Sequence, residues 1–282
     1  MVSMNRLSTE RRGQVIACLC EGMSIRGTVW VTGVAKNTVS KLLLDLGTTC
    51  SEYQDGALSN LNGKRFECDE IWSFIGVKER HVTEEHPADC GDVWTWTAID
   101  ADSKLVPSWL VGERDTHDCY VFLSDLRSRL KPGQRIQLTT DGFGSYPPVV
   151  DALWRDNIDY AVVIKEYGSQ DADYRYSPAV CTNMEVRKMA GQPDPSKINT
   201  SYVERQNLTM RMGMRRFTRL TYAFNRKIEN HAAAVSLHFM HYNFARPHQT
   251  LSKRYGRPTT PAMAAGVATY PWSVTQIAQL LD

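Results

Sequence analysis

The chain has 282 residues, enough for one large domain or for a catalytic domain with a small appendage. Hydrophobic residues make up 42% of it, including seven tryptophans, which excludes a mainly disordered chain. No stretch approaches 18 consecutive apolar residues and the first residues lack an apolar signal region, so we expect neither a membrane span nor export. The seven cysteines form no Cys-x-x-Cys pair, which favours the reducing cytoplasm.

The net charge of +2 conceals an uneven distribution of charged side chains. Residues 1–65 hold 8 basic and 5 acidic side chains, and residues 66–174 hold 10 basic and 21 acidic ones. Residues 204–257, in contrast, hold 11 basic and 2 acidic ones. An acidic centre suits a cation site, and a basic flank suits a polyanion. A solvated surface of both signs is the simpler alternative.

Three helices are predicted in the first 50 residues, because apolar residues recur at helical spacing within 8–23, 24–31 and 34–47, where Gly47 is a plausible stop. This layout, with a Gly-containing turn before the last helix, is that of a helix-turn-helix, whose last helix contacts base edges with its amino end. We therefore predict a small all-α helix-turn-helix domain over residues 1–50, with a polar-faced helical bundle as the alternative. The candidate DNA contacts on the last helix are Lys36, Asn37, Thr38, Ser40 and Lys41.

The rest of the chain predicts an α/β domain. Residues 51–65 are polar, with weak periodicity, and are interpreted as a linker. From residue 66 to about 250 the order is three strands, a helix, a strand, a short helix, a strand and two further helical stretches, which predicts a mixed sheet with flanking helices. Residues 168–199 are polar and are expected to form a loop insertion. Residues 251–282, rich in Pro and Ala, are expected to form a C-terminal tail.

Three carboxylates occupy positions that such a fold would bring together. Asp69 lies within the first strand, Asp141 closes the fourth and Glu204 begins a helix. A charge in a buried strand is costly unless it is paired or binds a metal. Oxygen ligands suit Mg²⁺, and two such ions about 4 Å apart clamp both oxygens of a phosphoryl transfer. The alternatives are a salt bridge for Asp69, a turn for Asp141, and a helix capping box with Ser201 for Glu204.

The helix that begins at Ser201 is predicted to carry a basic face. Glu204, Asn207, Arg211 and Arg215 stand at i, i+3, i+7 and i+11, so they lie roughly along one side of the helix. If Glu204 meets a metal-bound phosphate, the side chains farther along suit the adjoining nucleic-acid backbone. The candidate backbone contacts are Arg205, Asn207, Arg211, Arg215, Arg216 and Arg219.

Five segments together resemble insertion-sequence transposases of the DDE type, closest to the insertion-sequence-one group. In order, they are CDEIWSFIG, VWTWTAIDADSK, LTTDGFGSY, YVERQNLTMRMGMRRFTRLTYAFNRK and YNFARPHQTL. The resemblance implies a ribonuclease-H-like fold in which Asp69, Asp141 and Glu204 are the catalytic, metal-binding carboxylates. It implies Mg²⁺ as cofactor, two ions per site with Mn²⁺ as a substitute, for DNA cleavage at element ends and strand transfer into target DNA.

The same resemblance implies double-stranded DNA as the partner, both as terminal repeats and as target. It also implies a homo-oligomer on DNA, because joining two ends needs at least two protomers. The protein would act in the cytoplasm, associated with the nucleoid when bound to DNA.

The spacing of the third carboxylate departs from the family. Between Asp141 and Glu204 stand 62 residues, whereas relatives place only a few dozen there. Glu166 follows Asp141 after 24 residues, which is the spacing of the type pattern. Local sequence favours Glu204, because Glu166 ends a strand and lacks the ERQN helix with its basic face. The extra length then falls in residues 168–199.

Other chemistries find less support in the sequence. The group often carries an N-terminal zinc segment, but Cys18, Cys20 and Cys50 lack a convincing fourth ligand, and His81, His86 and Cys90 lie in a polar loop. A covalent recombinase using Ser201 or Tyr202 would leave Asp69 and Asp141 without a role. The candidates for acid–base work or support of the site are His117, His231, His238, His241, Arg246, His248 and Gln249.

Two further readings of the whole chain stay open. A helix-turn-helix regulator with a ligand-sensing α/β domain would explain both basic regions but not the three carboxylates. A decayed transposase that binds DNA without cutting it would retain the same sequence features.

Overall fold

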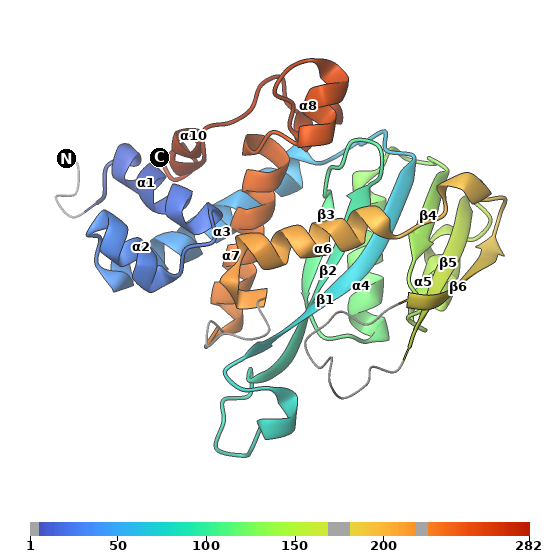
Figure 1. The fold of residues 1–282 in the computed structure, drawn as a ribbon, viewed down its shortest axis with the longest axis horizontal. Coiled ribbons are helices and arrows are strands. Elements are labelled where there is room, and N and C mark those ends of the chain that lie inside the picture. The colour runs from blue at the N-terminus through green and yellow to red at the C-terminus, as the bar shows by residue number, and fades with distance from the viewer. Residues whose placement is uncertain (1–5, 169–180, 218–224) are drawn as a thin grey trace.

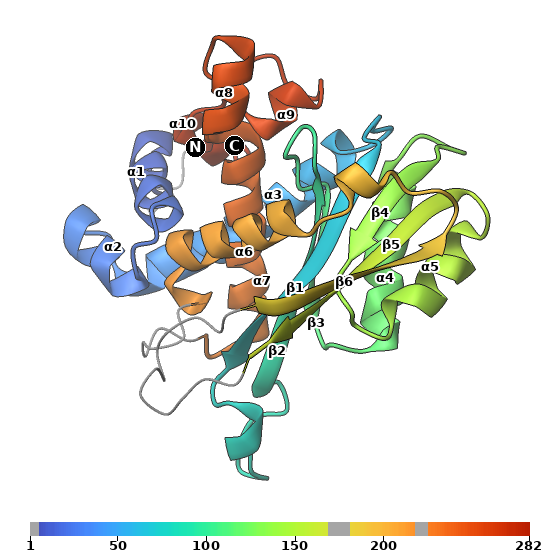
Figure 2. The same ribbon diagram turned by 45° about the vertical axis from the view of Figure 1, so that its right-hand side comes forward.

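A mixed six-stranded sheet forms the centre of the molecule (Figures 1 and 2). The computed structural model describes residues 6–168, 181–217 and 225–282. The strands are β1 (Arg65–Ile75), β2 (Gly91–Asp100), β3 (Ser108–Gly112), β4 (Ile136–Thr140), β5 (Ile158–Tyr167) and β6 (Cys181–Ala190). Their order across the sheet is β3-β2-β1-β4-β5-β6; β1, β3, β4 and β5 run in one direction, and β2 and β6 run antiparallel to them.

Helices cover both faces of the sheet and one end of it (Figure 1). The longer helices are α1 (Thr9–Cys20), α2 (Ile25–Thr32), α3 (Lys36–Ala57), α4 (Thr116–Arg129), α5 (Tyr146–Trp154), α6 (Ser201–Gly213) and α7 (Ile228–Met240). The C-terminal helices are α8 (Gln249–Tyr255), α9 (Pro261–Ala264) and α10 (Val274–Gln279). Short turns of other helix types are η1 (Glu79–His81), η3 (Pro195–Lys197), η4 (Arg215–Phe217) and η5 (His241–Ala245). Among the described residues no helix is both long and apolar enough to cross a bilayer.

Strand β1 shows how the alternating side chains of a strand divide between the two faces. Phe66 and Cys68 join the core formed with α4 and α5, where Trp96 packs against Phe122. Ile71, on the opposite face, packs with residues of α6 and α7 in a second core. The sheet is therefore buried on both faces, as predicted for the α/β domain, and its strand order is that of a ribonuclease-H-like fold.

The N-terminal helices pack directly against α7. Gly47 in α3 permits this contact, because a Cβ atom added there would stand 2.4 Å from Ala233 Cα. The Ser236 hydroxyl also donates to the Gly47 carbonyl at 2.7 Å. Gly47 was expected to stop the helix, but α3 continues to Ala57 because the close approach of α7 compensates for a poor helix former.

The boundaries drawn from the sequence therefore need correction in three places. Residues 51–57 of the expected linker belong to α3 rather than to a flexible segment. The described part of the expected insertion contains β6, which pairs antiparallel with β5 and extends the sheet. Residues 251–282, expected as a tail, contain α9 and α10, and α10 packs against α1. Polar composition misled for residues 51–57 and for β6, since edge strands and surface helices are polar too, whereas the Pro and Ala content misled for residues 251–282.

The start of α6 also differs from the expected capping box. Its N-cap is Thr200, whose side chain makes no capping bond, and the Ser201 hydroxyl donates instead to Asn199 Oδ1 at 2.6 Å. The buried carboxylate of Glu67 on β1 takes the capping role, since its Oε2 atom accepts the Tyr202 and Val203 N–H groups at 2.8 and 3.1 Å. An acidic group suits this position, where free N–H groups and the helix dipole favour negative charge.

Candidate active site

A pocket opens where β4 ends beside β1. The two strands pair from Arg65 to Cys68, and Cys68 lies opposite Thr140, the last residue of β4. Beyond this point β1 continues along β2 alone, so its next residues, Asp69 and Glu70, border open space. The pocket has a volume of about 590 Å³, and we call it the acidic pocket. Its lining residues include Asp69, Glu70, Arg114, Asp141, Lys165, Thr200, Glu204, Asn207 and Arg211.

Three carboxylates meet in the acidic pocket. One oxygen from each of Asp69, Glu70 and Asp141 lies within 4.8 Å of the other two. Backbone N–H groups orient two of them: that of Glu70 donates to Asp69 Oδ1 at 2.9 Å, and that of Phe143 donates to Asp141 Oδ1 at 3.0 Å. The strand end and the turn after β4 thus hold the two predicted aspartates in place, and they bring in Glu70 as a third acid.

The carboxylates of the acidic pocket destabilise one another when ionised. Burial, with the charges of Glu70 and Asp141 added, raises the pKa of Asp69 to about 8. Burial and the charge of Asp141 raise the pKa of Glu70 to about 7, and burial raises the pKa of Asp141. The raised pKa values mean that too little positive charge lies nearby to stabilise the ionised carboxylates. A cation bound in the pocket would supply that charge.

Glu204 lines the same pocket from the first turn of α6. Its Oε1 atom pairs with the Lys165 ammonium of β5 and accepts the Thr200 hydroxyl at 2.6 Å. Its charge raises the pKa of both Asp69 and Asp141, so it lies within electrostatic reach of them. Glu166, the alternative at the family spacing, is exposed, does not line the pocket, and accepts the Asn183 amide at 3.3 Å.

Arg114 and Glu70 are residues of the pocket that the sequence analysis missed. The Arg114 guanidinium donates to Glu70 Oε2 at 3.0 Å and approaches Asp141 Oδ2 at 3.6 Å. It stacks over the Phe143 ring, 4.1 Å from the centroid, and the Tyr146 hydroxyl donates to the other oxygen of Glu70. The only signal for Glu70 was a second unpaired carboxylate in a buried strand, and nothing marked Arg114, which lies just beyond β3.

The face of α6 carries the predicted residues, but they differ in exposure. Asn207 is only 4% exposed and donates to Asp69 Oδ2 at 2.8 Å, so it supports a carboxylate instead of reaching outward as a backbone contact. Arg211 is exposed and lines the acidic pocket with Glu204. Arg205 is exposed but does not line the pocket, and Arg219 lies outside the described residues.

The remaining predicted DNA contacts lie away from the acidic pocket. Lys36, Asn37, Thr38 and Lys41 are exposed at the amino end of α3, and Ser40 is half-buried. Lys41 is paired with Asp45 at 2.6 Å. A second depression lies between this end of α3 and η4, and its lining residues include Lys36, Ser40, Arg215 and Arg216.

The alternative catalytic groups are placed elsewhere. None of His117, His231, His238, His241, Arg246, His248, Gln249, Ser201 and Tyr202 lines the acidic pocket. Burial lowers the pKa values of His231 and His238 to about 3, so both are neutral core residues. Within the part of the chain that the structure describes, the only cluster of three or more potential metal ligands is Asp69, Glu70 and Asp141. The cysteine and histidine groups considered for zinc do not assemble there.

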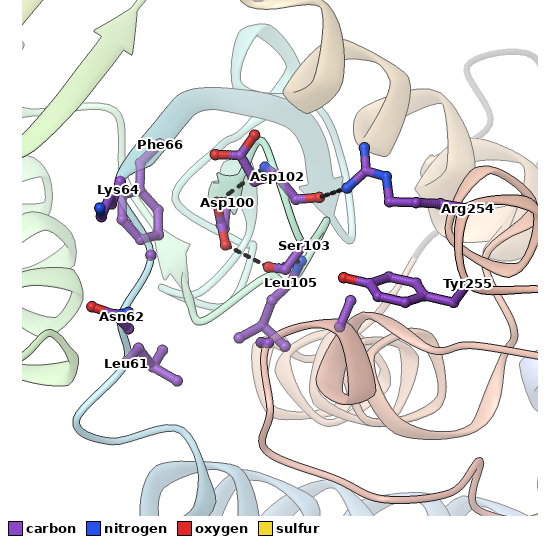
Figure 3. Close-up of a pocket in the computed structure, with 13 residues that line it drawn as sticks. Leu61, Asn62, Lys64, Phe66, Asp100, Asp102, Ser103, Leu105, Arg254 and Tyr255 are labelled. Carbon is purple, nitrogen blue, oxygen red and sulfur yellow. Dashed lines mark hydrogen bonds between the residues drawn. The ribbon is translucent and has the colours of Figure 1, made fainter.

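A smaller cavity of about 290 Å³ lies at the amino end of β1, and we call it the Asp100 cavity (Figure 3). It also contains two acidic residues. The Asp100 carboxylate accepts the Ser103 hydroxyl and, at 3.1 Å, the Asp102 N–H, while Arg254 donates to the Asp102 carbonyl at 3.2 Å. Ser103, Asp102 and Arg254 bond locally in this way, which is a structural role, and the acidic pocket is therefore the candidate active site.

The strand order and the carboxylates at the end of β4 define a ribonuclease-H-like domain with an acidic site. Residues 91–173 match the family model of a DDE domain. The chain is also 26% identical over 169 residues to the insertion element iso-IS1n protein InsB of Shigella dysenteriae. The aligned region covers 60% of this chain and 88% of that protein. These matches confirm the resemblance to DDE insertion-sequence transposases related to insertion sequence one.

Two solved structures align with the chain at lower similarity. A piggyBac transposase synaptic complex with hairpin DNA is 10% identical, over 100% of this chain and 72% of that one, with a TM-score of 0.45. The Mos1 mariner paired end complex with Mn is 10% identical, over 94% of this chain and 82% of that one, with a TM-score of 0.29.

Proposed function

We propose that the protein is a transposase that cleaves DNA at the ends of an insertion element and joins those ends to target DNA. The observation that carries this proposal is the convergence of Asp69, Asp141 and Glu204 on one pocket in a ribonuclease-H-like sheet. Their order along the chain matches the motif of the family that the sequence resembles. The proposed site of action is the cytoplasm, at the nucleoid when the protein is bound to DNA.

The acidic pocket suits divalent metal ions. Its ligands are carboxylate oxygens, which Mg²⁺ and Mn²⁺ prefer. The raised pKa values of Asp69 and Glu70 indicate a shortage of positive charge, and the buried Asn207 Oδ1 atom beside Asp69 has no hydrogen-bond partner within the described part of the chain. Asp69, Asp141 and Glu204 would hold the ions. Two bound ions would polarise the scissile phosphate and stabilise the attacking and leaving oxygens of an in-line displacement.

The chain's own residues have distinct proposed roles. Asn207 and the Glu70 N–H orient the Asp69 carboxylate, and Glu67 fixes the start of the helix that carries Glu204. Arg114, held by Glu70, places a cation at the pocket wall, where it can meet a phosphate oxygen. Lys165 pairs with Glu204, and it would be released to contact the DNA backbone if Glu204 ligated a metal.

The proposed DNA contacts comprise the predicted set, apart from the buried Asn207. Arg205, Arg211 and Arg215 are exposed along or just beyond α6, which leads away from the pocket. The exposed residues at the amino end of α3 offer a second contact surface, as expected of a helix-turn-helix. We further propose a homo-oligomer on DNA, because two element ends must be joined to one target.

The test is a cleavage and joining assay with labelled element-end duplex and Mg²⁺ or Mn²⁺. Asp141→Asn and Glu204→Gln are expected to abolish nicking and joining, whereas Glu166→Gln keeps both activities. If Glu166→Gln lost activity and Glu204→Gln kept it, Glu166 and not Glu204 would be the third carboxylate. DNA binding without metal-dependent cleavage by the parent protein would favour the regulator or the decayed transposase.

A further inference from the structure

The second depression in the surface, here called the basic groove, lies between the N-terminal helices and the carboxyl end of α6. It has a volume of about 660 Å³. Of the residues that the structure describes, five with cationic side chains line it: Arg26, Lys36, Arg215, Arg216 and Arg226. Among the described residues, its lining contains no Asp or Glu. Such a concentration of one sign of charge in a concave surface attracts a polyanion.

The cations of the basic groove are available for an external ligand. Arg26, Lys36, Arg215 and Arg226 are exposed, and none has an acidic partner among the described residues. The Arg216 guanidinium donates to the Asn230 carbonyl, and burial lowers its pKa to about 10, which leaves it charged at neutral pH. The helix α3, 22 residues long, begins at this groove without a side-chain N-cap, so its dipole adds positive potential there.

The groove is built rigidly into the fold. Gly22, in the turn between α1 and α2, packs so closely on the end of α6 that an added Cβ atom would stand 3.1 Å from the Gly213 carbonyl oxygen. On the other side, Gly47 of α3 meets Ala233 of α7. These two close backbone contacts fix the N-terminal helices against the catalytic domain. The groove is therefore preorganised. Residues of α6 line the acidic pocket, and Gly213 at the end of this helix lines the groove. Figure 2 shows α6 running from the sheet toward the N-terminal helices.

We infer that the basic groove binds the phosphodiester backbone of the DNA whose scissile phosphate lies in the acidic pocket. This inference rests on the proposed function, because it takes DNA as the ligand. From Glu204 to Gly213 the helix advances about 14 Å at about 1.5 Å per residue. Phosphates advance about 3.4 Å per nucleotide along one strand, so the groove holds phosphates about four to five nucleotides from the cleaved bond.

The inference divides the amino end of α3 between two roles. Lys36 and Ser40 line the groove, whereas Asn37 and Lys41 do not. Residues four apart share one side of a helix, so these two pairs lie on different sides. Lys36 and Ser40 therefore contact backbone, and only the side with Asn37 and Lys41 remains to meet base edges. Arg26 and Arg226, which no motif singled out, become DNA-binding residues.

The test compares a groove variant with a matched control of the same charge change. The groove variant is Arg26→Gln with Arg226→Gln; the control is Arg127→Gln with Lys131→Gln, two exposed residues in and just beyond α4. Binding of a fluorescent duplex of random sequence is measured over a salt series in the presence of EDTA. The groove variant is expected to bind about tenfold more weakly, with a salt slope reduced by about 2, while the control behaves like the parent.

Phosphate ethylation interference on an element-end duplex locates the contact. We expect interference about four to five nucleotides from the cleaved bond in the parent and its loss in the groove variant. If the groove variant bound DNA with the affinity and salt slope of the parent, the groove assignment would be overturned. Cleavage of DNA by the parent would still leave the proposed function intact in that case. A parent protein that neither binds nor cuts DNA would overturn both.

Discussion

The acidic pocket and the Asp100 cavity lie at different positions along β1, and both contain neighbouring acidic side chains. In the Asp100 cavity each acid has its own donor, since Ser103 donates to Asp100 and Arg65 donates to Asp102 at 2.7 Å. In the acidic pocket the oxygens of three acids lie within 4.8 Å of one another. Three carboxylates that crowd together repel one another when ionised, and this favours a bound cation, whereas Asp100 and Asp102 are held by Ser103 and Arg65 as part of the scaffold.

The strand pairing explains this difference. Around Asp100 the chain turns tightly from β2 to β3, and the Asp100 N–H donates to the Leu105 carbonyl at 2.8 Å, so backbone groups close the turn. At Asp69 the neighbouring strand β4 has already ended, which leaves the carboxylates facing solvent-filled space instead of a partner strand. The ends of parallel strands are where α/β sheets place their ligands.

The strongest test of the difference between the acidic pocket and the Asp100 cavity is to neutralise one acid in each of them. We expect Asp69→Asn to lower the rate of DNA cleavage by more than about 100-fold, because even outer partners of metal ligands contribute about 10- to 100-fold. The measurement is the rate of nicking of an element-end duplex at saturating Mg²⁺. Asp100→Asn is the counterpart in the Asp100 cavity, and its rate should stay within about threefold of the parent rate. Equal losses in the two variants would remove the distinction between site and scaffold.

Substitution of Glu67 is expected to have an intermediate effect on DNA cleavage, since this buried acid of β1 caps the amino end of α6. We expect Glu67→Ala to lower the free energy of unfolding by about 1–3 kcal/mol, because the Tyr202 and Val203 N–H groups lose their acceptor. Cleavage should fall by about tenfold or more through displacement of Glu204. The checks are urea denaturation and the nicking rate. Glu67→Gln retains one acceptor oxygen and should recover part of both, and full activity in Glu67→Ala would contradict the positioning role.

The sequence predicted the positions of Asp69, Asp141 and Glu204 better than their surroundings. Asp69 and Asp141 could be placed because strand ends are marked by apolar runs and by a following Gly, and Glu204 was preferred over Glu166 on local sequence. Glu70 was missed because side chains alternate along a strand, so Glu70 was expected on the face opposite to Asp69. Where the adjacent strand β4 ends, both side chains can reach the same open space. Lys165, by contrast, reaches the pocket only because β5 lies beside β4, which is a tertiary fact.

The boundaries failed for a related reason. The helix α3 continues through Gly47 because Ala233 of α7 packs on it, and strand β6 forms because β5 supplies an open edge. Both partners are distant in sequence, so local propensity could not reveal them. The helix-turn-helix role of the first 50 residues stays a prediction, although the helices lie in the predicted order.

Metal binding should shift thermal stability in a pH-dependent way. The pKa values of Asp69 and Glu70 are raised in the folded state, to about 8 and about 7, above ordinary values of about 4. Between about pH 4 and about pH 8 the folded protein therefore binds more protons at these two carboxylates than the unfolded chain does. The free energy of unfolding of the metal-free protein consequently falls as the pH rises through this range. Calorimetry should show that Mg²⁺ raises Tm by a few degrees, and by more at about pH 8 than at about pH 6, because ionised carboxylates bind it. Asp69→Asn should remove most of this shift, and a shift equal at both pH values would contradict it.

The smallest expected effect belongs to Asp102, the outer acid of the Asp100 cavity. Its side chain is 61% exposed, and its ion pair with Arg65 is open to solvent and salt. Exposed pairs contribute about 0–1 kcal/mol, so Asp102→Asn should lower the free energy of unfolding by less than about 1 kcal/mol, measured by urea denaturation. Its Mg²⁺-dependent rise in Tm and its nicking rate should match those of the parent. A loss of the Mg²⁺ effect in this variant would mean that the Asp100 cavity, not the acidic pocket alone, binds the metal.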